Sequence, residues 1–334
     1  MIGSRDVLDR SDQFRCFRAA DGELLWQVQY EAVGRLDYGN SPRATPLLYE
    51  GMVYLQSAFG MLKCIDLETG AEFWSVNLID QFGGRVQTWG VCWSPLIVDG
   101  KLIVQPGGEK GAIAALDPDT GETLWATKGE VGAYSSPIVA EFSSVKQIIA
   151  YDKTTLGGWD IETGKRLWTL KPKEENDFNV PTPIQIKDRL FLVTENNGAR
   201  LYEFDDKGKI KPEPASTFKD LAPDTHTPVV VGDRIFGVSE GLFCLSSKDL
   251  KQIWLSEDDL FRQYCAIVAS EDLCLVITLD AQLLLLSAKS EKYELLGKMA
   301  LTEEGTEVHA HPAFVGKHMF VRVGKMLKKI KIGE

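Results

Sequence analysis

The feature that most constrains the fold of this chain is a short phrase that recurs along it. The segments CIDLETGAEFW (64–74), ALDPDTGETLW (115–125) and GWDIETGKRLW (158–168) share a Thr-Gly pair and, four residues after the glycine, a tryptophan. Degenerate copies extend the series along the chain at spacings of 41 to 51 residues. The tryptophans of the series are Trp26, Trp74, Trp125, Trp168 and Trp254. Such a period indicates repeats that bury their apolar faces against their neighbours.

A second motif recurs along the chain with the same period as the Thr-Gly phrase. A proline, usually after a small residue, opens an apolar run, and a polar break and another apolar run follow, as in ATPLLYEGMVYL (44–55). The prolines are Pro46, Pro95, Pro137, Pro183, Pro228 and Pro312, and Ala266 holds the place in a copy without proline. Each unit therefore predicts four short strands, A to D: proline starts strand A, and Thr-Gly makes the turn from C to D.

Four-strand repeats of roughly 45 residues predict an all-β fold, a β-propeller of four-stranded antiparallel blades. We expect one domain over residues 1–334, with six complete blades in 40–300. Residues 1–30 supply only strands B to D of a first blade, and residues 308–334 only strands A to C of a last one. Counting strands leaves two closures open: eight blade positions with incomplete ends, or seven blades if the terminal fragments merge. The five tryptophans are expected to fill the wedges between blades.

Charge and cysteine usage exclude several classes of protein. The formal net charge is −11, which disfavours nucleic acid as a partner, and the dense basic stretch KMLKKIKI (325–332) alternates like a strand. No apolar run is long enough for a membrane helix, and the first residues do not form a signal peptide. The six cysteines include no CxxC and no adjacent pair, so we expect Cys16, Cys64 and Cys244, which share one repeat position, to pack in the core.

The Thr-Gly-x-x-x-Trp phrase and the Ser-Pro strand openings together resemble the pyrroloquinoline-quinone (PQQ) repeat. This repeat occurs in quinoprotein alcohol-dehydrogenase-like propellers and in the outer-membrane β-barrel assembly lipoprotein. The resemblance covers essentially the whole chain and favours eight blade positions. It implies a bacterial, exported or periplasmic protein whose N-terminal segment, with an export signal, is missing from this chain. The residues alone equally allow a cytoplasmic protein, and we expect a monomer.

The resemblance does not by itself transfer a cofactor, because one fold serves many functions. Quinoprotein dehydrogenases hold PQQ and calcium with a tryptophan floor, an aspartate base and adjacent cysteines. This chain has no adjacent cysteines and no acidic cluster with the spacing of a calcium site. Asp66, Asp117 and Asp160 recur at one repeat position, where we expect them to cap turns. The sequence thus predicts no catalytic residue, no cofactor and no metal. A quinone- or metal-dependent oxidoreductase with its site in the central channel remains the alternative.

The segments just before each strand A break the repeat and are the candidate binding site. In the propellers that this chain resembles, these segments meet at one mouth of the central channel, where function usually resides. The candidate ligand-binding residues are Arg43, Gln87, Trp89, Trp93, Tyr134, Asn179, His226, Arg262, Tyr264, His309 and His311. Aromatic, amide and imidazole groups around a concave site suit a protein, peptide or small ligand. Two other roles stay open: the side chains plug the channel, or His226, His309 and His311 bind zinc. The function predicted is a non-catalytic binding or assembly scaffold.

Overall fold

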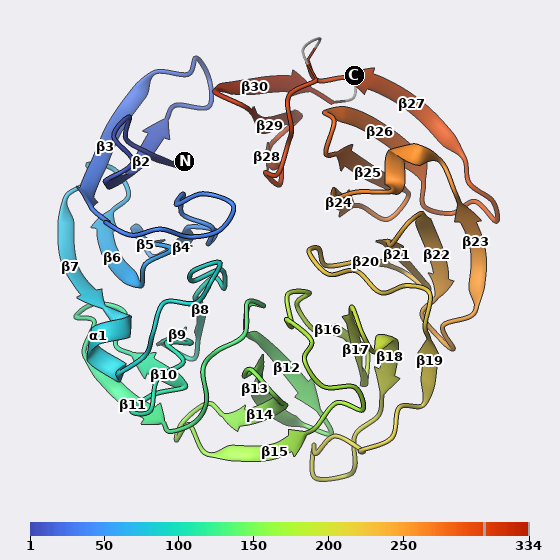
Figure 1. Cartoon of the computed structure of the whole chain (residues 1–334), viewed down its shortest axis with the longest axis horizontal. Helices are drawn as coiled ribbons and strands as arrows, with labels where there is room; N and C mark the ends of the chain where they lie inside the picture. The colour runs from blue at the N-terminus through green and yellow to red at the C-terminus, as the bar shows by residue number, and fades with distance from the viewer. Residues whose placement is uncertain (303–304, 333–334) are drawn as a thin grey trace. The chain divides into compact units, whose positions relative to one another are not determined.

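The computed structural model describes residues 1–302 and 305–332, whose regular secondary structure is almost entirely β-strand. Eight antiparallel sheets follow one another along the chain, each made of strands that are consecutive in sequence (Figure 1). Six sheets have four strands, and the first and last have three. The predicted all-β propeller with eight blade positions and incomplete end blades is confirmed. Among the residues described, no helix has the length and apolarity needed to cross a membrane.

The chain divides into two compact units, of which the first comprises residues 1–183 and 204–210. Its strands, sheet by sheet, are β1 (Ile2–Arg5), β2 (Ser11–Phe17) and β3 (Leu24–Glu31); β4 (Leu47–Tyr49), β5 (Met52–Gln56), β6 (Met61–Asp66) and β7 (Glu72–Asn77); β8 (Leu96–Val98), β9 (Lys101–Val104), β10 (Ile113–Leu116) and β11 (Thr123–Thr127); β12 (Ile138–Phe142), β13 (Val145–Tyr151), β14 (Leu156–Asp160) and β15 (Arg166–Leu170). A short helix, α1 (Leu78–Phe82), follows β7.

The second unit comprises residues 184–203 and the chain from 211 onward. Its strands are β16 (Ile184–Ile186), β17 (Arg189–Thr194), β18 (Gly198–Tyr202) and β19 (Ser216–Phe218); β20 (Val229–Val231), β21 (Arg234–Val238), β22 (Leu242–Ser246) and β23 (Gln252–Ser256); β24 (Cys265–Ala269), β25 (Leu273–Thr278), β26 (Gln282–Ser287) and β27 (Leu295–Ala300); β28 (Ala313–Val315), β29 (His318–Val323) and β30 (Met326–Lys331). One turn of 3-10 helix, η1 (Asp259–Phe261), follows β23.

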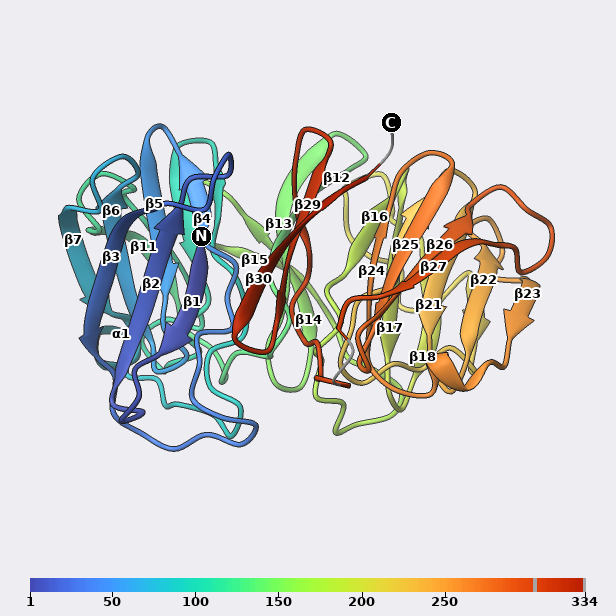
Figure 2. The same cartoon turned by 90° about the horizontal axis from the view of Figure 1, so that it is seen from above.

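The terminal sheets decide between the two predicted closures. The strands β1 to β3 lie side by side as a sheet of their own (Figure 2), and β28 to β30 form another. The seven-blade alternative is therefore wrong, since it requires β3 to join the last sheet. The strand-A prolines also differ slightly from the prediction: Pro46 precedes β4 by one residue and Pro312 precedes β28 by one. Proline has no N–H to give to the ladder, so pairing begins at the next residue.

The repeated phrase builds a capped turn. Gly70, Gly121 and Gly164 have φ values of 75°, 73° and 66°, in the left-handed region that favours glycine. The carboxylate of Asp66 accepts hydrogen bonds from the backbone N–H and the hydroxyl of Thr69, at 2.7 and 2.6 Å. Asp117 and Asp160 bind Thr120 and Thr163 in the same way. These hydrogen bonds lower the pKa of Asp66 and of Asp160. The predicted capping role of the three aspartates is confirmed.

Three tryptophans of the phrase reach from their own sheet to the turn of the next one. The indole N–H groups of Trp26, Trp74 and Trp125 donate to the carbonyls of Leu67, Pro118 and Ile161, at 2.8, 2.9 and 3.0 Å. Each ring also covers the next phrase's glycine: a Cβ on Gly70, Gly121 or Gly164 would lie 2.9, 2.7 or 2.3 Å from the indole. The phrase is thus a contact between repeats, with its tryptophan on one sheet and its glycine on the next.

The other two tryptophans vary this pattern. Trp254 on β23 donates to the carbonyl of Ser290 beyond β26, at 3.1 Å. Trp168 instead donates to the side chain of Gln147 within its own sheet, at 2.6 Å, and meets Phe204 edge-on. Phe204 lies in the segment 204–210, which belongs to the first unit and stacks on Phe142.

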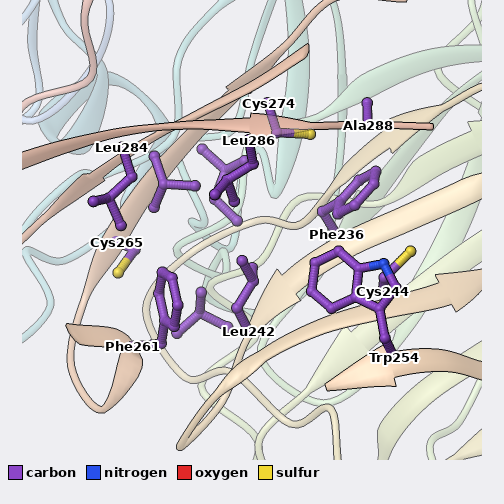
Figure 3. Packing of buried hydrophobic residues seen from close by; sticks show 13 residues of the cluster. Phe236, Leu242, Cys244, Trp254, Phe261, Cys265, Cys274, Leu284, Leu286 and Ala288 are labelled. Carbon is purple, nitrogen blue, oxygen red and sulfur yellow. The ribbon is translucent and has the colours of Figure 1, made fainter. Parts of the chain in front are cut away.

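The core between the sheets β20–β23 and β24–β27 is fully apolar. Phe236, Leu242, Cys244 and Trp254 pack against residues of β24 to β26 such as Leu284 (Figure 3). All six cysteines are free thiols. Cys64 and Cys244 are buried, as predicted, whereas Cys16 is only half-buried. Burial raises the thiol pKa of Cys244, Cys265 and Cys274 to about 12, so these groups are packing residues rather than nucleophiles.

Candidate functional site

Four aromatic rings meet in the first unit, each from the loop that precedes a strand A. Tyr38 precedes β4, Trp89 precedes β8, Tyr134 precedes β12 and Phe178 precedes β16. The ring centroid of Trp89 lies 4.7 Å from that of Tyr134, 4.7 Å from that of Phe178 and 6.5 Å from that of Tyr38. We call Tyr38, Trp89, Tyr134 and Phe178 the aromatic platform. Residues that are 140 positions apart in the sequence therefore share one surface.

The platform is exposed to solvent. Tyr38 is 90% exposed and Phe178 is 51% exposed, whereas Trp89 and Tyr134 are half-buried. Burial is the main cause of a raised pKa for the Tyr134 hydroxyl, which stays neutral near pH 7. Contiguous exposed aromatic surface on a folded protein marks an interaction site.

Three of the predicted site residues hold these loops in place. The Arg43 guanidinium donates to the carbonyl of Trp89 at 2.6 Å and to those of Asp37 and Gly39 at 2.8 Å. The Gln87 amide donates to the carbonyl of Gly132 at 2.7 Å. The loop carbonyl of Asn179 accepts from the backbone N–H of Ser135 at 2.9 Å. These bonds join successive loops, so the platform is held in one arrangement before any partner binds.

Other site residues lie elsewhere than the prediction implies. Trp93 is buried in the core beside Phe82 and Leu102, because its loop turns it inward. Tyr38 and Phe178 were absent from the predicted set, although both lie in pre-strand segments that break the repeat. An aromatic residue in a segment that breaks the repeat is the sequence feature by which both could have been predicted.

A cleft of about 470 Å³ lies in the same unit as the platform. Its lining residues are Gly83, Gly84, Arg85, Gly107, Glu109, Gly129, Glu130, Val131 and Lys153. The Asn179 amide donates to the carbonyl of Lys153 at 3.4 Å, which joins the cleft wall to the loop of Phe178. A Cβ on Gly107 would lie 2.2 Å from the backbone nitrogen of Gly132, so this wall needs glycine. The cleft offers both cations and carboxylates to a ligand.

In the second unit, His226 lies in a buried position close to Tyr264. Its Nε2 accepts a hydrogen bond from the backbone N–H of Val238 at 3.2 Å, and its Nδ1 has no partner among the residues described. Burial lowers the pKa of His226 to about 4. The Tyr264 ring lies 6.3 Å from the His226 ring, and its hydroxyl donates to the carbonyl of His309 at 3.1 Å. A neutral His226 is therefore an acceptor inside the fold.

The remaining predicted residues of this unit are exposed. The Arg262 guanidinium pairs with Asp259 at 2.9 Å, and His309 contacts Glu307 at 3.2 Å. Over residues 1–302 and 305–332, no three His, Cys, Asp or Glu side chains are grouped as metal ligands. The three histidines 226, 309 and 311 are therefore not gathered into one group of ligands in this part of the chain.

Comparisons with known proteins place the fold in a family. Residues 10–256 match the family model described as "Outer membrane protein assembly factor BamB". The protein of that name from Shewanella oneidensis is 24% identical over 234 residues, which cover 65% of this chain and 56% of that protein. The dehydrogenase subunit of the quinone alcohol dehydrogenase of Gluconacetobacter polyoxogenes is 26% identical over 201 residues, which cover 57% of this chain and 26% of that protein.

A solved structure agrees with the family match over almost the whole chain. The crystal structure of BamB from Moraxella catarrhalis superposes with a TM-score of 0.67 and covers 98% of this chain and 99% of that one, at 15% identity. At that identity the superposition shows a common fold. Because the family model matches well over half of the residues, and the repeat, the blades and this structure agree with it, the chain belongs to the BamB family of PQQ-like β-propellers.

Proposed function

We propose that this protein is a non-catalytic binding and assembly module whose aromatic platform binds an extended apolar segment of a partner protein. The observation that carries the proposal is the meeting of Trp89, Tyr134, Phe178 and Tyr38 on one exposed surface. Exposed aromatic side chains on a rigid support provide most of the energy of protein interfaces at little entropic cost. A protein segment is the ligand that such a surface suits best.

The ring geometry favours side chains over a flat cofactor. The Trp89 plane is inclined by 43° to that of Tyr134 and by 60° to that of Phe178. Inclined rings leave shallow hollows for aliphatic or proline side chains, whereas a planar quinone stacks best on a parallel ring face. We therefore propose that binding requires neither PQQ nor calcium.

The relatives support the same role. The Shewanella protein is by name an outer membrane protein assembly factor, and the family model has the same description. We propose by this likeness that the present protein is exported and takes part in assembling other proteins, as a monomer. A segment of a β-barrel outer-membrane protein is the partner to test first.

The test is an array of twelve-residue peptides that cover the strands of an outer-membrane β-barrel protein. Among the peptides that bind the wild-type protein, Phe178→Ala and Trp89→Ala should each weaken binding by at least tenfold. The reason is that truncating an aromatic hot-spot residue lowers the binding free energy by about 2 kcal/mol or more. Phe73→Ala is the matched control, since Phe73 is a 57% exposed phenylalanine of the same unit outside the platform. Equal losses for Phe73 and Phe178, or no loss for either platform variant, would refute the assignment.

The quinone alternative has its own experiment, because a quinone alcohol dehydrogenase is among the relatives. Purified protein is titrated with PQQ in the presence and absence of calcium chloride, and absorbance and melting temperature are recorded. We expect neither to change at stoichiometric PQQ. A stoichiometric shift together with alcohol-dependent dye reduction would replace the binding function with an oxidoreductase.

A further inference from the structure

The cleft of the first unit is walled largely by main chain. Four connections between elements line it, from α1 to β8, from β9 to β10, from β11 to β12 and from β13 to β14. The backbone N–H of Lys110 donates to the carbonyl of Phe82 at 3.0 Å, which joins the first two connections. A Cβ on Gly84 would lie 2.8 Å from the carbonyl oxygen of Pro106, so the walls approach too closely for a side chain there. The shape of the cleft is therefore set by backbone rather than by mobile side chains.

Charged side chains of both signs line this cleft. They are Arg85, Glu109, Glu130 and Lys153. Among the residues described, none of the four forms an ion pair, either with another of them or with a residue elsewhere. Glu130 accepts a hydrogen bond from the hydroxyl of Thr154 at 2.7 Å, and the other three side chains have no hydrogen-bond partner in the described chain. Two cations and two carboxylates that line one cleft without pairing are complementary to a ligand that carries both charges.

Backbone N–H groups add further donors to the cleft. Those of Gly129, Glu130 and Val131, three consecutive lining residues, have no acceptor among the residues described. The N–H groups of Arg85 and Glu109 also have none in the described chain. Main-chain N–H groups without an internal partner, consecutive ones above all, are the donors that proteins use to bind anionic oxygens. A carboxylate in the cleft therefore has main-chain donors as well as two cations.

We propose that this cleft binds a short free peptide in its zwitterionic form. Its carboxylate pairs with Arg85, Lys153 and the unpaired N–H groups, and its ammonium pairs with Glu109 and Glu130. A compact space of about 470 Å³ is roughly 8 Å across, which an extended dipeptide of about 7 Å spans.

The two carboxylates disfavour a purely anionic ligand, and the two cations disfavour a purely cationic one. None of the four rings of the aromatic platform lines the cleft. The site is thus a second one, and it does not depend on the function proposed for the platform.

The probe is dialanine, titrated into the full-length protein by isothermal titration calorimetry. We expect saturable binding to one site, weakened by salt because the four charged side chains are exposed. N-acetyl-dialanine lacks the ammonium and dialanine amide lacks the carboxylate, so each should bind at least fivefold more weakly. Equal binding of the acetylated peptide would assign an anion site instead, and equal binding of the amide a cation site. Either result, or no saturable binding of dialanine, would overturn the proposal.

Charge-neutralising variants locate the site. Arg85→Gln and Glu109→Gln should each weaken dialanine binding at least fivefold. Arg10→Gln and Glu68→Gln are the matched controls, since both residues are exposed in the same unit, do not line the cleft and make the same change in charge. Circular dichroism confirms that all four variants are folded. Equal losses for the controls and the cleft variants would overturn the proposal.

The two cleft variants should also differ in which end of the peptide they recognise. Arg85→Gln should reduce the preference for dialanine over its amide and keep the preference over the acetylated peptide, and Glu109→Gln should do the reverse. In wild type, the amide resonances of Gly129, Glu130 and Val131 should shift in nuclear magnetic resonance spectra as dialanine binds. Unchanged preferences in both variants, or resonance shifts confined to residues outside the cleft, would overturn the assignment.

Discussion

At the scale of single residues, the repeated phrase works as a pair of positions on neighbouring sheets. The glycine of each turn must be glycine for two separate reasons: its φ is positive, and an indole from the preceding sheet lies where a Cβ would be. Trp74 over Gly121 and Trp125 over Gly164 are examples. Position 250 shows the exception, because Leu250 adopts a φ of 59° at the same place in the repeat and is buried in the core instead.

Two alanine variants separate these reasons. Gly121→Ala should lower the free energy of unfolding by about 2–5 kcal/mol, the sum of left-handed strain and overpacking against Trp74. Gly100→Ala should cost only about 1–2 kcal/mol, since Gly100 has a similar φ of 69° but no atom near the position of a Cβ. Urea unfolding measures both. Equal costs would show that the indole contributes nothing to the requirement for glycine.

His226 predicts a pH dependence of stability. Its pKa is about 4 in the folded protein, and a histidine in an unfolded chain titrates near 6.5, so the unfolded chain takes up the proton first as pH falls. Stability should therefore decrease from about pH 6.5 down to about pH 4, by roughly 3 kcal/mol in total. The nearby titratable groups are Asp224, which opposes the shift, and His311, which adds to it.

The variant His226→Gln isolates this effect, because glutamine can accept the hydrogen bond from Val238 but does not titrate. Its free energy of unfolding should fall less steeply than that of wild type between pH 6.5 and 4. His309→Gln, at an exposed site, should leave the slope unchanged. Parallel curves for wild type and His226→Gln would contradict the prediction.

At the scale of elements, neighbouring sheets are joined by large side chains from one outer strand. Trp254 on β23 packs against Phe236 of its own sheet and Tyr293 beyond β26, with ring centroids 5.8 and 5.9 Å away (Figure 3 shows its place in the core). Its indole N–H also donates to Ser290. Packing and hydrogen bonding therefore both join β20–β23 to β24–β27.

Two substitutions divide these contributions. Trp254→Ala should cost about 3–5 kcal/mol of unfolding free energy, because it leaves a large cavity. Trp254→Phe keeps most of the ring but removes this hydrogen bond, at a cost of about 0.5–1.5 kcal/mol, because the Arg234 guanidinium still donates to the Ser290 carbonyl. Denaturant unfolding followed by circular dichroism measures both. A phenylalanine variant as unstable as the alanine variant would show that the hydrogen bond dominates the contact.

At the scale of the whole molecule, the protein is acidic. The net charge of −11 at pH 7 keeps copies apart, and the sequence pI is near 5.0. Solubility should therefore pass through a minimum near pH 5, where mutual repulsion vanishes. Equilibrium solubility between pH 4 and 8 measures this, with circular dichroism to confirm that the protein stays folded. A solubility that falls steadily to pH 4 without a minimum would contradict it.

The sequence predicts the fold of this protein in more detail than its candidate binding site. The Thr-Gly phrase and the prolines predicted four-stranded sheets and their strand order, and the family resemblance favoured eight of them over seven. The recurring aspartates predicted the capped turns at Asp66, Asp117 and Asp160. The prediction for the pre-strand loops was coarser. It included Trp93, which is buried, and Arg43, which binds backbone carbonyls, and it omitted Phe178.

The sequence by itself determined the four-strand repeat, the incomplete ends and the family resemblance, whereas the structure decided between eight blade positions and seven. Each blade depends on hairpins and on contacts with the next repeat, and such contacts recur at a fixed spacing that a single chain displays. The tertiary structure alone decided which loop side chains meet. Arg43 reaches Trp89 across 46 residues and Trp89 meets Phe178 across 89, and these contacts do not repeat. A contact made once leaves no period in the sequence, so it becomes visible only when the loops are folded.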